Sequence, residues 1–317
     1  MTTMNFTLCV LTLNASKTSQ ALLSSLAMQT VANIDVLVID TSSNDATLDF
    51  FKAAHFRTHL VTAEAFNHGA TRQLAVELSP NADIIIFMTQ DASLATPSAI
   101  RHLLNAFNDP KVGAAYGRQL QAEDATPIAA HARLFNYPSS SYVRSKEDIP
   151  YFGIKTSFMS NSFAAYRRSA LMETGGFPPS VILSEDTMVA AKMLQAGWKL
   201  AYCADATCFH SHNYSMIEEF KRYFDIGVFH GREPWYLKTL GTAEGEGLRF
   251  VRSELRYLQA TAPALIPSAL LRTLVKFCAY RLGRLEKYLP LRLKRLLSMN
   301  KGFWHIPTHG PDNRNYH

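Results

Sequence analysis

Strand-like and helix-like stretches alternate along the first part of the chain. The segment Ile84–Met88 is apolar at every position, as expected for a strand that is covered on both faces of a sheet. The predicted strands are Asn5–Leu13, Ile34–Ile39, Thr58–Val61 and Ile84–Met88. The predicted helices that follow them are Lys17–Thr30, a segment ending at Phe51 and a segment ending at Leu78. This alternation predicts an α/β fold with a right-handed, doubly wound, parallel sheet.

Polar residues close each of these strands. They are Thr12 and Asn14, Asp40 and Ser42, Asn67 and His68, and Gln90 and Asp91. In open α/β sheets ligands bind outside the carboxyl ends of the strands, so these side chains are candidates for a binding site. Taken singly, each is also explained as a turn or helix-cap residue. No glycine-rich dinucleotide motif or phosphate loop follows the first strand, which argues against a dehydrogenase or an ATPase.

The alternation weakens in the second half of the chain. Further strands are predicted at Val112–Gly117, Phe158–Tyr166 and Lys199–Cys208, a short helix at Arg167–Pro178, and a mobile loop at Phe135–Ile149. A longer helix is predicted to begin at Ser184, with Glu185 and Asp186 in its first turn, and to end at Gly197. Carboxylates in a first turn favour the helix dipole, so capping alone also explains them.

Two histidines, His210 and His212, follow the last predicted strand. We expect at most one of them to face a given ligand, on the premise that the two side chains point to opposite faces of an extended segment. A lone histidine at such a place is more often structural than metal-binding. An Asp that ends a neighbouring strand makes a ligand role more plausible.

Composition adds few constraints. The chain has 317 residues, of which 47% are hydrophobic and 18% are charged, as in an ordinary globular protein with one large or two smaller domains. Its four cysteines lack metal-type spacing and indicate a reducing compartment without a disulfide framework. We predict no signal peptide and no membrane-spanning helix.

Positive charge is concentrated near the end of the chain. The net charge is +6, and Leu271–Asn300 contains eight Lys or Arg residues against the single acid Glu286. The apolar residues that share one predicted helical face here are Leu270, Leu271, Leu274, Val275, Cys278, Ala279, Leu282, Leu285 and Leu289. Docking on an anionic membrane and packing on the catalytic domain or on a second subunit explain this segment equally well. No nucleic-acid-binding motif accompanies the charge.

An ordered set of short motifs runs through residues 5 to 230. In sequence order they are Thr-Leu-Asn14, Val-Ile-Asp40, Ser-Ser-Asn-Asp-Ala-Thr47, Phe-Asn-His-Gly-Ala-Thr-Arg72, Thr-Gln-Asp91, Gly-Gly-Phe177, Ser-Glu-Asp186, Ala-Gly-Trp198 and His-Ser-His212. The set resembles family 2 inverting glycosyltransferases of the GT-A fold. It is most similar to bacterial rhamnosyltransferases that use dTDP-L-rhamnose and build O-antigen or related surface polysaccharides.

The resemblance implies roles for the residues that close the strands. Asp40 would read the pyrimidine base of the donor, with Thr12 and Asn14 lining the same pocket. Asp91 would hold Mg²⁺ or Mn²⁺ against the donor diphosphate, with His210 as a further ligand. Gln90 stands where the family often has an acid, which leaves Asp91 as the only carboxylate of that motif.

Further roles follow for the residues of the predicted helices. Asp186 would be the general base that takes the proton of the attacking hydroxyl. Glu185 would orient the acceptor or cap the helix. Asn67, His68 and Arg72 would meet the phosphates or the sugar of the donor, although Arg72 is also explained as a surface ion-pairing residue.

The resemblance implies a glycosyltransferase domain at residues 1–235, with a donor half at about 1–110 and an acceptor half at about 111–235. A helical, basic and amphipathic region would follow at residues 236–317. The implied activity is transfer of L-rhamnose from dTDP-L-rhamnose to a hydroxyl of a growing, lipid-linked bacterial glycan. The enzyme would be cytoplasmic and peripheral on the inner face of the cell membrane. The alternatives are a UDP-hexose donor, a nucleotidyltransferase, and a non-catalytic membrane scaffold that binds nucleotide sugars.

Overall fold

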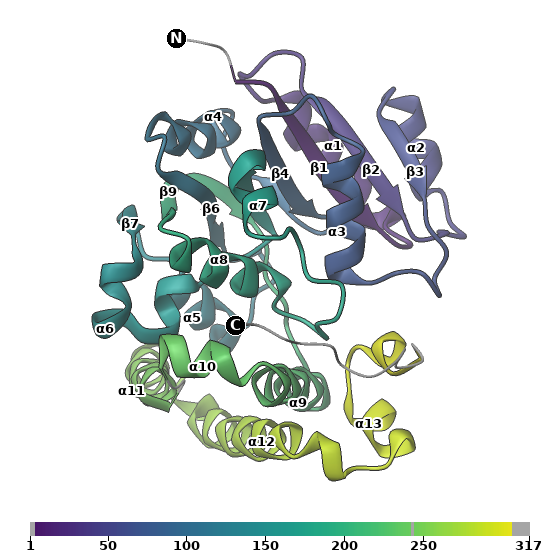
Figure 1. Ribbon diagram of the computed structural model, residues 1–317. Coiled ribbons are helices and arrows are strands. Elements are labelled where there is room, and N and C mark those ends of the chain that lie inside the picture. The colour runs from purple at the N-terminus through teal and green to yellow at the C-terminus, as the bar shows by residue number, and fades with distance from the viewer. Residues whose placement is uncertain (1–3, 242–243, 306–317) are drawn as a thin grey trace, which may run out of the picture.

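The computed structural model describes residues 4–241 and 244–305 and shows one mixed sheet flanked by helices (Figure 1). The strand order is β3-β2-β1-β4-β8-β6-β9-β5, and β7 pairs with β9 outside this order. The strands are β1 (Phe6–Thr12), β2 (Asp35–Asp40), β3 (Arg57–Leu60), β4 (Ile84–Thr89), β5 (Ser93–Leu94), β6 (Val112–Leu120), β7 (Tyr142–Arg144), β8 (Phe163–Arg167) and β9 (Lys199–Phe209). The predicted α/β class is confirmed, and strands β1 to β4 are parallel.

Helices cover both faces of the sheet and continue beyond it. They are α1 (Ser16–Ala27), α2 (Thr47–Ala53), α3 (His68–Glu77), α4 (Ala99–Asn105), α5 (Pro127–Asn136), α6 (Ile149–Phe152), α7 (Arg168–Glu173), α8 (Glu185–Gln195), α9 (Met216–Arg232), α10 (Pro234–Leu240), α11 (Glu244–Thr261), α12 (Ile266–Arg284) and α13 (Leu291–Leu297). Helices α1, α2 and α4 pack on one face of the sheet, and α3, α7 and α8 pack on the other. Within the described residues, no helix is long and apolar enough to cross a membrane.

Strand β4 shows why its sequence lacks alternation. Ile84, Ile86 and Met88 contribute to the core under α1 and α4, whereas Ile85 and Phe87 contribute to the core under α3 and α8. Because a central parallel strand buries side chains on both faces, every position is apolar. The run ends where the strand reaches the carboxyl edge of the sheet.

Two predictions for the middle of the chain are wrong. The segment predicted as a mobile loop, Phe135–Ile149, contains the end of α5 and all of β7, which pairs with β9. The Tyr142 hydroxyl lies 2.7 Å from the Tyr116 hydroxyl, and Arg144 stacks over the Tyr142 ring. These partners are distant in sequence, so local composition did not reveal the strand. Strand β8 also begins later than predicted, at Phe163, because residues 158–162 form a turn.

A third apolar core joins the C-terminal helices to α8. It includes Met188 of α8, Val228 and Phe229 of α9, and Ala279 of α12. Asp225 of α9 is fully buried and accepts hydrogen bonds from the backbone N–H groups of residues 299 and 300. The helical C-terminal extension is thus confirmed. The domain boundary at residue 235 stays a prediction, and residues 306–317 of the predicted basic region lie outside the described residues.

Helices α9 and α12 touch at glycines. A Cβ atom at Gly283 would lie 2.0 Å from the backbone oxygen of Phe224, and one at Gly227 would lie 2.2 Å from the backbone oxygen of Tyr280. Backbone atoms cannot yield as a flexible side chain does, so the two helix axes would have to move apart.

We therefore expect Gly283→Ala to lower the free energy of unfolding by about 2 kcal/mol, because overpacking outweighs the helix propensity that Ala gains. Urea denaturation measures this change. The matched control is Gly247→Ala in α11, where an added Cβ has no neighbour within 4 Å. That variant should be more stable by roughly 0.5–1 kcal/mol. A neutral or stabilising effect of Gly283→Ala would contradict the close packing of α9 and α12.

Candidate active site

The sheet topology collects the ends of β1, β2, β3, β4, β6 and β9 and the start of β8 at one edge. In the register of β1, Thr12 pairs with Asp40 of β2 and Leu11 pairs with Thr89 of β4. Strands β6 and β9 are parallel and end together. Strand β8 is antiparallel to β4, so the turn before Phe163 lies beside the end of β4. The candidate residues after these strands therefore meet at one edge.

Asp40 organises the loops that follow β1 and β2. Its carboxylate is fully buried and accepts hydrogen bonds from the Thr12 hydroxyl at 2.8 Å and from the Ser43 backbone N–H at 2.7 Å. Asn14 accepts a hydrogen bond from the backbone N–H of Asn44 at 3.0 Å. The structure thus brings Thr12, Asn14 and Asp40 together as expected. Their polar atoms hold the two loops in place.

Gln90 fastens the end of β4 to the loop after β1. Its Oε1 accepts a hydrogen bond from the Leu13 backbone N–H at 2.7 Å, and its Nε2 donates to the Leu13 carbonyl at 3.1 Å. An amide both donates and accepts, whereas an ionised acid only accepts. This explains why a glutamine occupies a position where the family often has an acid. The side chain supports the loop next to Asp91.

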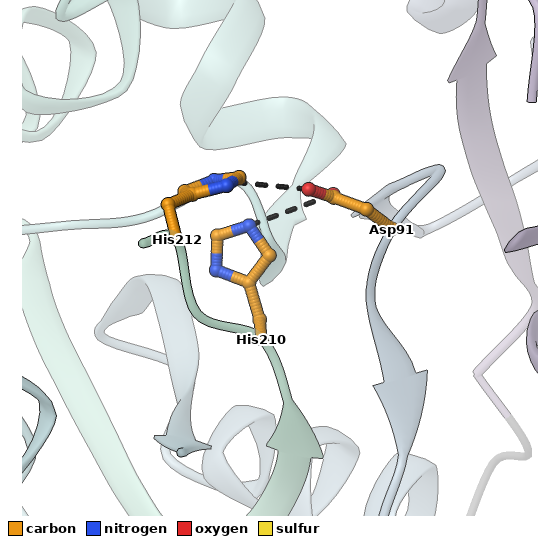
Figure 2. Close-up of side chains that lie close together, drawn as sticks. All are labelled: Asp91, His210 and His212. Atoms are coloured by element: carbon orange, nitrogen blue, oxygen red, sulfur yellow. Dashed lines mark ion pairs between the residues drawn. The ribbon is translucent and has the colours of Figure 1, made fainter. Parts of the chain in front are cut away.

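Three potential metal ligands converge beyond β4 and β9 (Figure 2). Asp91 lies 3.5 Å from His210 Nε2 and 3.7 Å from His212 Nε2, through different carboxylate oxygens. One ligand atom from each of the three residues lies within 4.8 Å of the others. The predicted pair Asp91 and His210 is thus found together, with His212 as a third member.

The expectation that at most one of the two histidines faces a ligand is wrong. Its premise was mistaken, because side chains two residues apart on an extended segment share a face. Strand β9 also ends at Phe209, so strand geometry does not fix the directions of His210 and His212. Both rings turn toward Asp91, with ring centroids 4.6 Å apart (Figure 2).

Gln119, at the end of β6, determines how His210 is oriented. The His210 Nδ1 lies 3.0 Å from Gln119 Oε1, which also accepts a hydrogen bond from Arg133. Gln119 Nε2 donates to the Ser160 hydroxyl at 2.7 Å. Since Oε1 can only accept, His210 Nδ1 carries the proton. With Nδ1 as the donor to Gln119, Nε2 of His210 can present a lone pair toward Asp91, which suits a cation between the two.

Electrostatics favour the metal-binding forms of the other two residues. Burial lowers the pKa of His212 to about 4, so its imidazole is neutral at neutral pH. Burial alone would raise the pKa of Asp91, but the two facing histidines hold that pKa well below its ordinary value. Ionised Asp91 and neutral His212, together with Nε2 of His210, would form a complete set of metal-binding side chains.

Arg72 lies apart from this cluster. It is buried and forms an ion pair with Glu185, with 2.7 Å between Arg72 Nη1 and Glu185 Oε1. Arg72 therefore forms an ion pair, which was the alternative to donor binding, but the pair is buried and does not lie on the surface. Asn67 is the N-cap of α3 and accepts hydrogen bonds from two backbone N–H groups, and the His68 ring packs against Phe66. The structure therefore uses Arg72 and Asn67 for support.

Asp186 follows Glu185 at the start of α8. Ser184 precedes them as the N-cap residue, with a left-handed φ of 64° and no side-chain cap hydrogen bond, so the helix begins where predicted. Asp186 accepts hydrogen bonds from the backbone N–H groups of Thr187, at 2.8 Å, and of Asn161, at 3.2 Å. Burial, then repulsion by Glu185, raises the pKa of Asp186 to about 7. A carboxylate with such a pKa accepts protons well at neutral pH.

The turn before β8 connects Asp186 with the metal-ligand cluster. Asn161 contacts Asp186 through its backbone and Glu185 through its side chain, at 3.2 Å each. The next residue, Ser162, has its hydroxyl 3.5 Å from His210 Nε2. The base candidate and the metal-ligand candidates therefore belong to one site.

Sequence reasoning missed Gln119, Asn161, Ser162 and the ligand role of His212. Asn161 and Ser162 had been placed inside a predicted strand. The one available signal was the polar run from Ser160 to Ser162, which interrupts the apolar pattern before Phe163. Gln119 has no comparable signal, because its partners come from distant segments.

We expect His212→Ala to weaken Mn²⁺ binding by at least about tenfold, a loss typical even of residues that only support a metal ligand. Calorimetric titration of the protein with MnCl₂ measures the dissociation constant. His59→Ala in the edge strand β3 is the control and should bind Mn²⁺ like the original protein. Unchanged affinity in His212→Ala would limit the protein ligands to Asp91 and His210.

Comparisons with known proteins agree with this geometry. The model of glycosyl transferase family 2 matches residues 7–175. The O-antigen chain rhamnosyltransferase RfbN of Salmonella typhimurium is 50% identical over 302 residues, which cover 95% of this chain and 96% of the relative. The O-antigen chain rhamnosyltransferase WbaN of Salmonella anatum is 46% identical over 301 residues, with the same coverage.

Solved structures support the fold. The mannosyltransferase PcManGT of Pyrobaculum calidifontis, in complex with GDP-Man and Mn²⁺, has a TM-score of 0.59 and 19% identity over 93% of this chain and 85% of its own. Residues 1–349 of TarS from S. aureus give a TM-score of 0.52 and 15% identity over 90% of this chain and 91% of that chain. The nucleotidyltransferase and scaffold alternatives are therefore set aside. The chain belongs to glycosyl transferase family 2 and is a glycosyltransferase of the GT-A fold.

Proposed function

We propose that this enzyme moves L-rhamnose from dTDP-L-rhamnose to a hydroxyl of a growing surface glycan of the O-antigen type. The sugar and the pathway are supported by two relatives, 50% and 46% identical, that are named O-antigen chain rhamnosyltransferases. The chemistry is supported by one observation above all. A carboxylate with a raised pKa, Asp186, is joined through Asn161 and Ser162 to the cluster of Asp91, His210 and His212.

In this proposal Asp186 is the general base of an inverting transfer. Inversion is a single displacement in which the acceptor hydroxyl attacks the anomeric carbon from the face opposite the diphosphate. The hydroxyl loses its proton as the bond forms, and a carboxylate within hydrogen-bond reach takes it. The backbone N–H groups of Asn161 and Thr187 hold Asp186 in place. No covalent intermediate is needed.

Glu185 tunes and positions this base. It is buried beside Asp186, and its negative charge makes the Asp186 carboxylate a better proton acceptor. Arg72 offsets the charge of Glu185 so that both can lie in the interior. We therefore revise the role of Arg72 from donor binding to support of the base. Glu185 acts through Asp186 and does not contact the acceptor.

Asp91, His210 and His212 would hold the divalent cation. Bound there, the ion would neutralise the charge that develops on the departing diphosphate. Two imidazoles with one carboxylate suit Mn²⁺ better than Mg²⁺, which prefers oxygen ligands and retains several waters. Two matching structures, PcManGT and GalNAc-T7, were solved with Mn²⁺.

The loops after β1 and β2 would receive the nucleotide. Thr12 and Asp40, joined by a hydrogen bond, would lie at the bottom of the nucleotide site. Asn14 and Gln90 would line its side, because their hydrogen bonds hold the loops next to it in place. A lipid-linked acceptor would approach from the side of Asp186. Such an acceptor would place the enzyme on the cytoplasmic face of the cell membrane.

Calorimetric titration with dTDP, dTDP-L-rhamnose and UDP-glucose tests the choice of donor. With Mn²⁺ present, we expect the two dTDP compounds to bind roughly tenfold or more tightly than UDP-glucose, and EDTA to weaken binding of all three. Tighter binding of UDP-glucose would leave the proposed mechanism intact but contradict dTDP-L-rhamnose as the donor. No binding of any nucleotide would overturn the proposed function.

The pH dependence of kcat/KM tests the base. Because Asp186 must be deprotonated to act, and its pKa is raised to about 7, the rate should fall as the pH drops through neutrality. Glu185→Gln removes the repelling charge and leaves Arg72, so the acidic limb should move to lower pH. The pH profile is obtained by measuring the rate at which rhamnose enters the lipid-extractable glycan of a membrane fraction at each pH.

Asp186→Asn is the companion variant, and it should abolish transfer at every pH while dTDP still binds. An acidic limb at the same pH in Glu185→Gln as in the original enzyme would assign the titration to another group. Full turnover by Asp186→Asn would remove Asp186 as the base.

A further inference from the structure

Helix α12 turns its small and charged residues toward the protein. Ala269, Ala279 and Gly283 are buried against α9 and its neighbours. Arg272 and Lys276 lie on the same face and pair with Glu219 of α9, at 2.9 Å and 3.7 Å. The positions 269, 272, 276, 279 and 283 recur every three or four residues, so they form one continuous stripe along the helix.

The opposite face of α12 is exposed and apolar except for Arg281. We call it the outer stripe, and its residues are Leu270, Leu271, Leu274, Phe277, Cys278, Arg281 and Leu285. Leu274 and Phe277 each keep 58% of their surface exposed. A surface helix normally buries its large apolar side chains and exposes its charged ones. In α12 Arg281 and Arg284 are exposed as usual, but the large apolar side chains of the outer stripe are exposed with them, so this stripe lacks the cover that such a face requires.

The exposed apolar surface continues past the end of α12. Tyr288, Leu291 and Leu296 are exposed to 72%, 53% and 66%. Cations lie among these residues, and the exposed ones are Arg281, Arg284, Lys287 and Arg292. Helix α12 lies on the far side of α9 from the sheet (Figure 1). Large apolar side chains mixed with cations fit a surface that is apolar inside and anionic outside.

We propose that the outer stripe of α12, together with Tyr288 and Leu291, docks on an anionic lipid bilayer. The leucines and Phe277 would enter the boundary between headgroups and acyl chains, and the four cations would meet lipid phosphates. A second copy of the chain is a poorer occupant. A symmetric contact through the same stripe would bring like cations of two copies together, which opposes association.

The docking surface is mechanically joined to the active site. Helix α12 packs on α9, and α9 begins at Met216, shortly after His212 in the chain. A bilayer held against α12 is therefore tied to the segment that carries two of the metal-ligand candidates. Docking would bring the active site close to its acceptor only if the acceptor is lipid-linked. In that respect the inference rests on the proposed function.

Sedimentation with lipid vesicles tests the inference on the full-length protein. We expect binding to vesicles that mix phosphatidylcholine with phosphatidylglycerol, and little binding to phosphatidylcholine alone. The double variant Leu274→Glu, Phe277→Glu should weaken binding by at least about tenfold, because two apolar side chains that would enter the bilayer are replaced by carboxylates. Glu is a good helix former, and both positions are exposed, so the helix should persist.

Met28→Glu is the matched control. Met28 is an exposed apolar residue (57%) at the end of α1, outside the outer stripe. The Met28→Glu variant should therefore bind vesicles like the original protein. Undiminished binding by the double variant would overturn the inference, as would failure of the original protein to bind anionic vesicles. A dimer in analytical ultracentrifugation that the double variant abolishes would also overturn it, because a second copy would then cover the stripe.

Cys278 offers a direct probe of the contact. It is exposed on the outer stripe, whereas burial raises the pKa of the Cys9, Cys203 and Cys208 thiols to about 12 and slows their labelling. A polarity-sensitive fluorophore on Cys278 should shift to the blue when anionic vesicles are added. No shift, despite sedimentation, would place the contact elsewhere. Titration with dTDP is independent of both measurements, so failure of the donor assignment is distinguishable from failure of docking.

Discussion

The ion pair between Arg72 and Glu185 is the contact on which the active site depends. It joins α3, near the donor loops, to the first turn of α8, and both side chains are buried. Removing one partner of such a pair leaves an uncompensated charge in the interior, at a cost of about 3–5 kcal/mol. The same pair sets the charge beside Asp186. Structure and chemistry are thus coupled, because the contact that holds the two segments also adjusts the proton affinity of the base.

Neutral amides do much of the positioning around this pair. Gln90 ties the end of β4 to Leu13, Gln119 fixes the ring of His210, and Asn161 spans Glu185 and Asp186. An amide satisfies a donor and an acceptor without adding charge. The charged groups that remain at the edge of the sheet are therefore available for a cation, a diphosphate and a proton.

The C-terminal helices obey a different constraint. Glycines at positions 227 and 283 let α9 and α12 approach at backbone distance, and Glu219 pairs with both Arg272 and Lys276 between them. Burying the small and charged face leaves the leucines of α12 outside. The apolar face predicted from the sequence is thereby divided, because Ala279 joins the interior while Leu274 remains exposed. Packing on the catalytic domain and an exposed apolar surface occur in the same helix, on opposite faces.

The sequence by itself determined the α/β class, the edge of the sheet that bears the site, and Asp40, Asp91, Asp186 and His210 as its candidates. The class, the edge, Asp40 and Asp91 depend on local periodicity and on polar residues that end apolar runs, which neighbouring residues reveal. The resemblance to a known family added Asp186 and His210. Only the tertiary structure decided that Arg72 pairs with Glu185, that His212 joins Asp91, and that α12 is turned leucine side out. Each of these depends on partners brought together by strand order and helix packing, and a single sequence does not encode such distances locally.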